Sequence, residues 1–338
     1  MRAMLVKQFG PPSALVFEEV PDLVPGTGQV VVEVGAVSVN FPDILVVEGT
    51  YQTLPERPFS PGKEAAGRVI AVGAGVDRVE VGRRVLALVE YGAYAEQLLV
   101  AEELVTVLPD AVSCEQAAAA GLVCTTAHFG LHRRARLRAG ETVLVTGAGG
   151  GVGSAGVQLA KAAGARVIAL AQDAAKGDLA RAQGADLVLT STPRTLRDDL
   201  LAATDGRGVD VVLEMLGGDY LTQIIRATAW EGRIVVVGFA SGGQNPIKPG
   251  HLLVKNISVV GLQSSDYRER DPELMRATTA EILGLLADGR LDAAIDTTFP
   301  LARAAEALGY VKDGRARGKV VLTTGPARRR PAGRAAPR

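Results

Sequence analysis

A glycine-rich run between residues 147 and 153 has the clearest chemical meaning in the sequence. It follows an apolar, strand-like segment at 142–146 and precedes a helical pattern of apolar residues. Glycine lacks a Cβ atom, so the backbone can turn sharply and approach a ligand, and the helix start offers free N–H groups and a positive dipole end to an anion. This order favours a dinucleotide diphosphate site over a tight loop without a ligand. The residues expected to bind the diphosphate are Gly147, Gly150, Gly151, Val152 and Gly153.

The end of the next strand-like segment, 166–171, bears on which dinucleotide binds. In NAD-binding folds an acidic residue at this point bonds the ribose 2′-hydroxyl. The sequence has Ala171 there, and Lys176 follows closely enough to pair with the 2′-phosphate of NADP. Asp173 favours NAD instead, because a carboxylate could bond a ribose hydroxyl and would repel a phosphate. We expect NADP(H), with NAD(H) as the alternative, and we place both Asp173 and Lys176 at the cofactor.

Length and composition limit the possible functions. The 338 residues correspond to about two domains, and 47% apolar and 22% charged residues are typical of a globular protein. The 37 basic and 37 acidic residues balance, so the net charge does not point to nucleic acid or an anionic membrane. No apolar stretch is long enough to predict a transmembrane helix. Cys114 and Cys124 cannot build a disulfide framework or a four-cysteine zinc site, and we expect a cytoplasmic protein.

The first third of the chain is rich in β-type residues separated by turn formers. No helix longer than two turns fits before residue 110, so we expect a compact β barrel or roll. The expected strands are 29–39, 65–72, 79–88 and 96–100.

The pattern changes near Pro109. Ser113 and Gln116 have the spacing of a helix capping box, and an Ala-rich helix is expected to follow as far as about Leu131. Six apolar runs then alternate with helical or loop segments, which predicts βαβ units and a doubly wound parallel sheet. The six expected strands are 142–146, 166–171, 186–189, 209–213, 233–237 and 257–260.

The chain changes again after about residue 263. One helix at 272–286 and a strand pair near 297–299 and 319–322 are expected to return to the first domain. The segment 326–338 is basic and Pro-rich, and we expect it to be disordered. Such a tail could touch nucleic acid or an acidic lipid, but a passive tail is the simpler interpretation.

Together these motifs resemble those of the zinc-independent quinone oxidoreductases, a branch of the medium-chain dehydrogenase/reductase superfamily. The resemblance runs in unbroken order from Met1 to about Thr324. It rests on the segments 40–43 (Asn-Phe-Pro-Asp), 49–51 (Gly-Thr-Tyr), 58–67, 150–153, 232–238 and 318–321.

The resemblance implies an α/β protein with two domains. A GroES-like, β-rich catalytic domain is expected at 1–121 and 264–325. A Rossmann domain with a doubly wound, six-stranded parallel sheet is expected at 122–263, inserted within the first domain, and 326–338 is the tail. The family likeness also implies a homodimer and an active cleft between the two domains.

Zinc is not an expected cofactor. The zinc alcohol dehydrogenases of this superfamily carry Cys in the segment matching 37–39 and His before the Glu of a Pro-Gly-His-Glu motif. Here the first segment has no Cys, and Lys63 stands at the His position. An ammonium group cannot ligate zinc unless it is deprotonated, and His128 and His132, at helical spacing, lack the Glu of a His-Glu-x-x-His site.

The resemblance also suggests which side chains face the substrate. Tyr51 matches the Tyr regarded as proton donor in related enoyl-thioester reductases, and in the quinone branch it is expected to line the substrate site; loop packing is the alternative. Asn40 is the second candidate donor, expected near the nicotinamide. Asp43 could orient Asn40 or Lys63, or cap a helix that begins after Pro42. The expected catalytic residues are Tyr51 and Asn40, and the expected substrate-binding residues are Phe41, Asp43 and Tyr51.

Further cofactor residues follow from the same resemblance. Thr126 matches a Thr near the nicotinamide, although its hydroxyl could instead bond the helix backbone. Residues after two strands of the parallel sheet are expected to hold the carboxamide, because such a sheet binds ligands at its carboxyl edge. Arg317 and Lys319 match the closing motif, with a surface salt bridge as the alternative. The set is Asn40, Thr126, Leu216, Gly238, Phe239, Ala240, Arg317 and Lys319.

Without a metal Lewis acid, alcohol oxidation is poorly served, whereas a quinone or an α,β-unsaturated carbonyl delocalises the charge of an arriving hydride. We therefore expect an NADPH:quinone oxidoreductase that acts on a small quinone or enone. One alternative is an enoyl-thioester or 2-alkenal reductase of the same fold. Another is a non-catalytic nucleotide-binding or RNA-binding protein. For the enzyme we expect neither a membrane nor a nucleic acid as partner.

Overall fold

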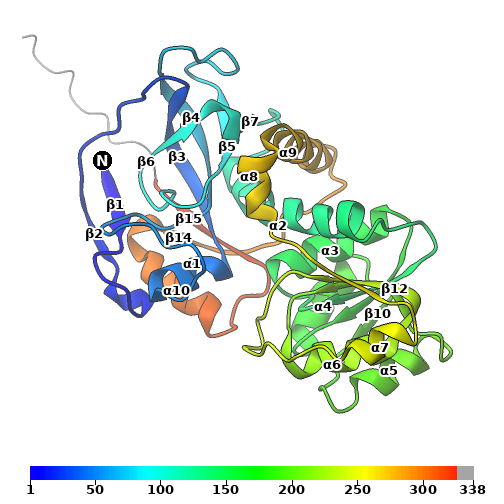
Figure 1. The fold of residues 1–338 in the computed structure, drawn as a ribbon. Coiled ribbons are helices and arrows are strands. Elements are labelled where there is room, and N and C mark those ends of the chain that lie inside the picture. Colours follow the sequence, from blue (N-terminus) through cyan, green and yellow to red (C-terminus); the bar gives the residue numbers. More distant parts are fainter. Residues whose placement is uncertain (326–338) are drawn as a thin grey trace, which may run out of the picture.

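The computed structural model describes residues 1–325, which form two units, each built around one large β-sheet (Figure 1). One unit contains the N-terminal third of the chain together with its last described strands, so the other unit is an insertion within it. This confirms an α/β protein with a separate β-rich part. The expected boundaries at 121–122 and 263–264 stay predictions, and the expected tail lies outside the described residues.

The inserted unit has a six-stranded parallel sheet in the order β10-β9-β8-β11-β12-β13. This order, with the first strand central and the chain reversing beside it, is that of a dinucleotide-binding fold. The strands are β8 (Thr142–Thr146), β9 (Arg166–Leu170), β10 (Leu187–Leu189), β11 (Val209–Glu214), β12 (Thr228–Val236) and β13 (Ser258–Gly261). The helices are α3 (Gly151–Ala162), α4 (Ala174–Ala182), α5 (Leu196–Ala202), α6 (Gly218–Ala227) and α7 (Pro249–Leu253).

Burial on both faces explains why these strands read as continuous apolar runs. All five residues of β8 are buried. Alternate side chains of a strand point to opposite faces, and here Val143 and Val145 join the core beneath α3, while Leu144 joins a second core with Leu196 of α5. Helices therefore cover the sheet on both sides, which is the doubly wound arrangement predicted.

The other unit has a mostly antiparallel seven-stranded sheet, in the order β14-β15-β3-β4-β5-β7, with β6 also pairing with β3. A two-stranded sheet of β1 and β2 lies beside it. The strands are β1 (Arg2–Leu5), β2 (Val16–Glu19), β3 (Gln29–Val39), β4 (Glu64–Val72), β5 (Arg84–Leu88), β6 (Gln97–Ala101), β7 (Val105–Val107), β14 (Ile295–Pro300) and β15 (Lys319–Thr323). The remaining helices are α1 (Phe41–Glu48), α8 (Tyr267–Arg270), α9 (Pro272–Ala287) and α10 (Ala304–Lys312).

Helix α2 (Cys114–His128) lies between the two units (Figure 1). Ser113 caps it with Gln116 in the predicted capping box, and a π-helical segment, Phe129–Arg134, extends it. Residues 117–127 are all buried, because the helix packs on α3 and α9 as well as on β3 and β4. A small-residue helix buried all round fits this central position.

Several expected boundaries were wrong. Strand β5 begins at Arg84 rather than at residue 79, since Gly82 adopts a φ of 94° in a turn before it. Strand β12 begins at Thr228 rather than at residue 233, because its first residue pairs with Val209 ahead of an irregularity in register. Helix α10 and strand β7 were not expected at all.

Within residues 1–325, no helix combines the length and the apolar character that a membrane crossing requires.

Two glycines should respond oppositely to an added methyl group. A Cβ at Gly67 in β4 would lie 2.0 Å from the Glu33 carbonyl oxygen, whereas a Cβ at Gly284 in α9 would meet nothing within 4 Å. We predict that Gly67→Ala lowers the free energy of unfolding by about 1–3 kcal/mol and that Gly284→Ala raises it by about 0.5–1 kcal/mol. Urea unfolding measures both, and a stable Gly67→Ala protein would contradict the close β3–β4 approach.

Candidate active site

The glycine-rich turn joins β8 to α3 as the sequence predicts. Gly147 has a left-handed φ of 57°, and Gly150 is the N-cap of α3. A Cβ at Gly153 would lie 2.2 Å from the Gly147 carbonyl oxygen, so no larger residue fits between the helix and the turn. The positive end of the helix dipole therefore lies at the carboxyl edge of the sheet, where such folds hold a diphosphate.

Lys176 lies over this turn. A Cβ at Gly149 would be 2.5 Å from Lys176 Cβ, so the lysine stem contacts the turn backbone. Its Nζ donates to Gln172 Oε1 at 2.8 Å and to the Gly314 carbonyl at 2.9 Å. Asp173 caps α4 by accepting from the Lys176 backbone N–H at 2.9 Å. The carboxylate that favoured NAD is thus engaged at a helix start, while the lysine lies beside the turn.

The loops that follow β11 and β12 meet beside the turn. Leu216 lies near Gly147, and the Ala240 N–H donates to the Met215 carbonyl at 2.9 Å, which ties the two loops together. Glu214, buried at the end of β11, accepts from the Leu216 N–H at 2.8 Å, and burial raises the pKa of its carboxyl. These loops contain the expected residues Leu216, Gly238, Phe239 and Ala240.

Lys319 links the glycine turn to the other unit. Its ammonium donates to Asn40 Oδ1 at 2.6 Å and to the Val39 carbonyl at 3.2 Å. Its stem contacts Gly151, where an added Cβ would be 2.9 Å from Lys319 Cδ. The residue is buried, and burial lowers the pKa of the ammonium, whereas the Glu64 carboxylate favours the charged form. The expected cofactor residues Asn40 and Lys319 are therefore brought to the turn together.

Both the nitrogen and the oxygen of the Asn40 side-chain amide are hydrogen-bonded. Its Nδ2 donates to Ser38 Oγ at 3.1 Å and to Glu64 Oε1 at 3.0 Å, while its Oδ1 accepts from Lys319. Glu64, fully buried, also accepts from the Leu122 N–H of α2 at 2.6 Å. The amide is held between a cation and a carboxylate, so it forms a fixed part of the site. Its role as a donor to substrate stays a prediction.

Asp43 is buried in the first turn of α1. Its Oδ2 accepts from the Asn40 backbone N–H at 2.8 Å and from the Tyr94 hydroxyl at 3.0 Å, while Oδ1 has no hydrogen-bond partner among the described residues. Burial raises the pKa of this carboxyl to about 6, although the Asn40 hydrogen bond and the Lys63 charge act against the rise. Asp43 thus caps the helix that follows Asn40, and its contact with substrate stays a prediction.

Tyr51 is half-buried and lies against a cation. Lys63 Nζ is 4.5 Å from the centre of its ring, a cation–π distance. Burial and the Glu90 carboxylate raise the pKa of the phenol, while a hydrogen bond with Gln263 acts in the other direction. The phenol therefore keeps its proton at neutral pH and can donate a hydrogen bond.

Lys63 and Arg268 share the carboxylate of Glu90. Lys63 Nζ pairs with one carboxylate oxygen, and Arg268 Nη2 pairs with the other. Both cations are buried, whereas the Glu90 side chain is 26% exposed. Lys63 immediately precedes β4, and Arg268 belongs to α8. The Glu90 carboxylate therefore links two residues that are 205 positions apart in the sequence.

Thr126 and Cys124 both lie on α2 and are buried. The Thr126 hydroxyl is 2.7 Å from the Leu122 carbonyl and 2.8 Å from Ser264 Oγ. The hydrogen bond with the Leu122 carbonyl is the helix-backbone bond that the alternative interpretation expected. The position of Thr126 near the nicotinamide stays a prediction. Cys124 is buried, which raises the pKa of its thiol to about 12, so the thiol is not a nucleophile at neutral pH.

Two expected residues are peripheral. Arg317 is exposed, and its backbone N–H donates to Asp296 at 3.1 Å. Phe41 begins α1 and is 44% exposed. Within the described chain, neither side chain belongs to the buried network around Asn40, so their ligand contacts stay predictions.

The donor set at Lys63 does not fit a zinc ion, because its ammonium is paired with Glu90. In residues 1–325, no three or more His, Cys, Asp or Glu side chains are grouped so that they could hold a metal. The rings of His128 and His132 are 4.6 Å apart, and His128 Nε2 is 3.5 Å from Glu281 Oε2 on α9. Burial lowers the pKa of both imidazoles, which suits a packing role between α2 and α9.

Sequence reasoning missed several members of the site. Glu64 carried a usable signal, because an acidic residue begins an apolar, buried strand and must find partners. Gly121 makes room for it, since a Cβ there would be 2.6 Å from Glu64 Oε2. Nothing local marks Glu90, Gln263 or Arg268, which meet Tyr51 only through the tertiary fold.

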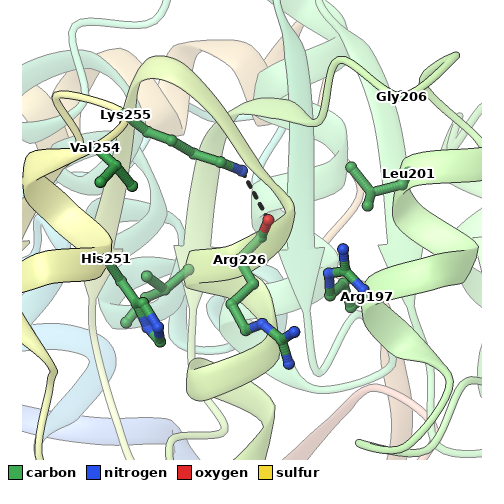
Figure 2. A pocket seen from close by; sticks show the side chains of 8 residues that line it. Arg197, Leu201, Gly206, Arg226, His251, Val254 and Lys255 are labelled. Atoms are coloured by element: carbon green, nitrogen blue, oxygen red, sulfur yellow. Dashed lines mark hydrogen bonds between the residues drawn. The ribbon is translucent and has the colours of Figure 1, made fainter.

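A separate basic pocket of about 300 Å³ lies among α5, α6 and α7 (Figure 2). Lys255 points toward the end of α6 and donates to the Arg226 and Thr228 carbonyls at 2.7 and 3.0 Å. Arg197 lies across the pocket and pairs with Asp198. None of the predicted site residues lines this pocket, and its lysine serves as a helix cap.

Two family models match the chain. "Alcohol dehydrogenase GroES-like domain" matches residues 26–110, and "Zinc-binding dehydrogenase" matches residues 151–280. The first match confirms the expected GroES-like character of the β-rich unit.

Individual proteins are similar over almost the whole chain. "Quinone oxidoreductase-like protein 2 homolog" from Nematostella vectensis is 38% identical over 302 residues, which are 88% of this chain and 82% of that protein. A mycobacterial protein solved in complex with NADPH has a TM-score of 0.90 at 31% identity, covering 96% of this chain and 100% of its own. The JamJ enoyl reductase has a TM-score of 0.86 at 26% identity, covering 95% and 98%.

The pKa of Asp43 predicts a pH dependence of stability. Its folded pKa, about 6, lies above the ordinary value of 3.8, so the folded protein binds this proton more tightly than the unfolded chain. The resulting stability is complete below about pH 4 and is lost as the pH rises through 6, by about 3 kcal/mol in all. Relative to Asp43→Asn, the wild type should therefore weaken between pH 4 and 7 in urea unfolding. Asp178→Asn, at an exposed position, controls for the loss of one carboxylate, and parallel curves for Asp43→Asn and wild type would contradict the buried carboxyl.

Proposed function

The chain belongs to the quinone oxidoreductase branch of the medium-chain dehydrogenase/reductase superfamily, and we propose that it is an NADPH-dependent, zinc-independent reductase of quinones. The observation that carries the proposal is the contact of Lys319 with Gly151, which brings the glycine turn to the polar side chains of the other unit. NADPH, when bound, supplies a hydride. The chain's own residues must then position the cofactor, exclude water and hydrogen-bond the acceptor oxygen.

The turn supports NADPH over NADH. Ala171 provides no acidic partner for a ribose 2′-hydroxyl, and Asp173 is engaged as the cap of α4. Lys176 lies against Gly149 and carries a charge suited to a 2′-phosphate. The related mycobacterial complex with NADPH agrees with this choice. NADH is the alternative cofactor.

Tyr51 is the proposed donor to the acceptor oxygen. Its phenol is protonated at neutral pH, and Lys63 against its ring together with Gln263 restricts its orientation. As a quinone accepts hydride, negative charge develops on oxygen, and a donor fixed in advance stabilises that charge. A quinone also spreads the charge over its own ring, so its reduction depends only modestly on this one donor.

An enoyl-thioester or 2-alkenal reductase is the second candidate, supported by the likeness to the JamJ enoyl reductase. In that reaction a proton must reach carbon after hydride transfer, so the Tyr51 phenol would act as a general acid. The two candidates therefore make different demands on the same hydroxyl.

The family likeness also supports a cytoplasmic homodimer with domains at 1–121 and 264–325 and at 122–263. The paired ammonium of Lys63 supports the zinc-independent mechanism.

Replacing Lys176 with Ala tests the cofactor assignment. We expect KM for NADPH to rise about tenfold, the effect of losing one charge-assisted contact, while KM for NADH changes less than twofold because NADH has no 2′-phosphate. Steady-state kinetics with 9,10-phenanthrenequinone measures both values. Arg181→Ala, on the same helix and paired with Asp178, is the control and should change neither. A wild type that prefers NADH tenfold would contradict the role of Lys176.

Tyr51→Phe separates the two reactions. We expect the variant to keep most of its turnover with 1,4-benzoquinone, since the acceptor delocalises the charge itself. Wild-type turnover with crotonyl-CoA or a 2-alkenal should be much slower than with quinones. A wild type that prefers crotonyl-CoA, together with a hundredfold loss in Tyr51→Phe, would instead establish the enoyl reductase. Binding of NADPH without turnover of any acceptor would exclude both.

A further inference from the structure

A buried guanidinium with an unused donor lies in the cluster beside Tyr51. The Arg268 side chain is 7% exposed, and its Nη2 pairs with Glu90. Its Nη1 is buried without a hydrogen-bond partner among the described residues. Burying an unpaired N–H of a charged group is unfavourable by comparison with hydrating it. The guanidinium is therefore prepared for an acceptor that this part of the chain does not supply.

Positive charge exceeds negative charge in this cluster. Lys63 and Arg268 are both buried, and the one carboxylate of Glu90 serves both of them. Lys63 Nζ also donates to the Glu90 backbone carbonyl at 3.3 Å, so Glu90 accounts for two of its three N–H groups. Two cations that share one carboxylate favour further negative charge nearby, and the Asp43 carboxylate supplies part of it through its charge interaction with Lys63.

The other buried charged side chains form a separate hydrogen-bonded network. Lys319 donates to Asn40, which in turn donates to Glu64, and Asp43 accepts from the Asn40 backbone. No hydrogen bond in the described structure joins these residues to Arg268. The deeper network therefore gives Arg268 no hydrogen-bond acceptor, although the Asp43 carboxylate interacts with the Lys63 charge through space.

The cluster of Lys63, Glu90 and Arg268 lies beside Tyr51, the proposed hydrogen-bond donor. Lys63 lies 4.5 Å from the centre of the Tyr51 ring, and the charges of Glu90 and Arg268 both act on the phenol. Tyr51 and Glu90 are partly exposed, whereas the two cations are buried. The Tyr51 ring therefore lies beside Lys63, and its phenol is close enough to Arg268 to be affected by the guanidinium charge.

We propose that Arg268, assisted by Lys63, determines specificity by binding an anionic oxygen group on the acceptor. The inference rests on the proposed function and narrows its substrate class to quinones or enones that carry a carboxylate or a similar anion beside the reducible system. A planar carboxylate matches the fork of a guanidinium and accepts from Nη1. Glu90 repels such a group, and the two cations outweigh that repulsion.

Binding without turnover is the first test. Naphthalene-2-sulfonate and the neutral naphthalene-2-sulfonamide are titrated calorimetrically into the wild type, Arg268→Gln and Arg268→Lys in the presence of NADP⁺. We expect the sulfonate to bind the wild type at least tenfold more tightly than Arg268→Gln, with Arg268→Lys in between, and the sulfonamide to bind all three alike. Arg270→Gln, on the same helix but exposed, should match the wild type. Equal sulfonate affinity in wild type and Arg268→Gln would overturn the proposal.

Kinetics distinguish this inference from the proposed function. With NADPH as the hydride source, kcat/KM is measured for 1,4-naphthoquinone and for its 2-sulfonate, in the wild type and in Arg268→Gln. For each acceptor, the wild-type kcat/KM is divided by that of the variant. The ratio for the sulfonate is then divided by the ratio for the parent quinone, which cancels the intrinsic reactivities of the two acceptors. We expect Arg268→Gln to lose at least ten times more activity toward the sulfonate. Reduction of both quinones with no such difference would overturn the inference alone. If the sulfonate binds in a way that depends on Arg268 but neither quinone is reduced, the proposed function is contradicted, whereas the anion site at Arg268 is supported. If Arg268→Gln unfolds, Arg268→Lys carries both tests.

Discussion

The close approach of backbone at the glycine turn is the constraint on which the rest of the site depends. No side chain fits at Gly153 between α3 and the turn, and a side chain at Gly151 would displace Val123 or Lys319. The first contact brings the positive end of a helix to the carboxyl edge of the parallel sheet. The second brings a lysine of the GroES-like unit against that same helix start. Two units from distant parts of the chain are thereby joined at the point where a dinucleotide would lie.

Buried charge maintains this junction. Lys319 reaches Asn40, Asn40 reaches Glu64, and Glu64 accepts an N–H of Leu122 on the central helix α2. Each of these groups would be unfavourable to bury alone, and each is stabilised by the next. In the proposed function, this network lies beside the cofactor. The second cluster, Lys63 and Arg268 around Glu90, lies instead beside Tyr51, where we propose that the acceptor binds.

The sequence predicted those parts of the molecule in which local pattern and tertiary environment agree. The strands at Gln29–Val39 and Thr142–Thr146 match the expected bounds to the residue, because long or fully buried apolar runs leave little choice. The first part of β12, residues 228–232, was missed, since its pairing depends on a neighbouring strand rather than on its own pattern. The glycine turn was recognisable from its spacing, whereas Arg268 carries no local signal and gains meaning only from Glu90, which lies 178 residues away.

Calorimetric titration of the wild-type protein with NADPH tests the central claim most directly, because it asks whether the turn binds a dinucleotide before any question of acceptor arises. We predict saturable binding of one NADPH per chain. An absence of measurable binding of both NADPH and NADH by folded protein would contradict it.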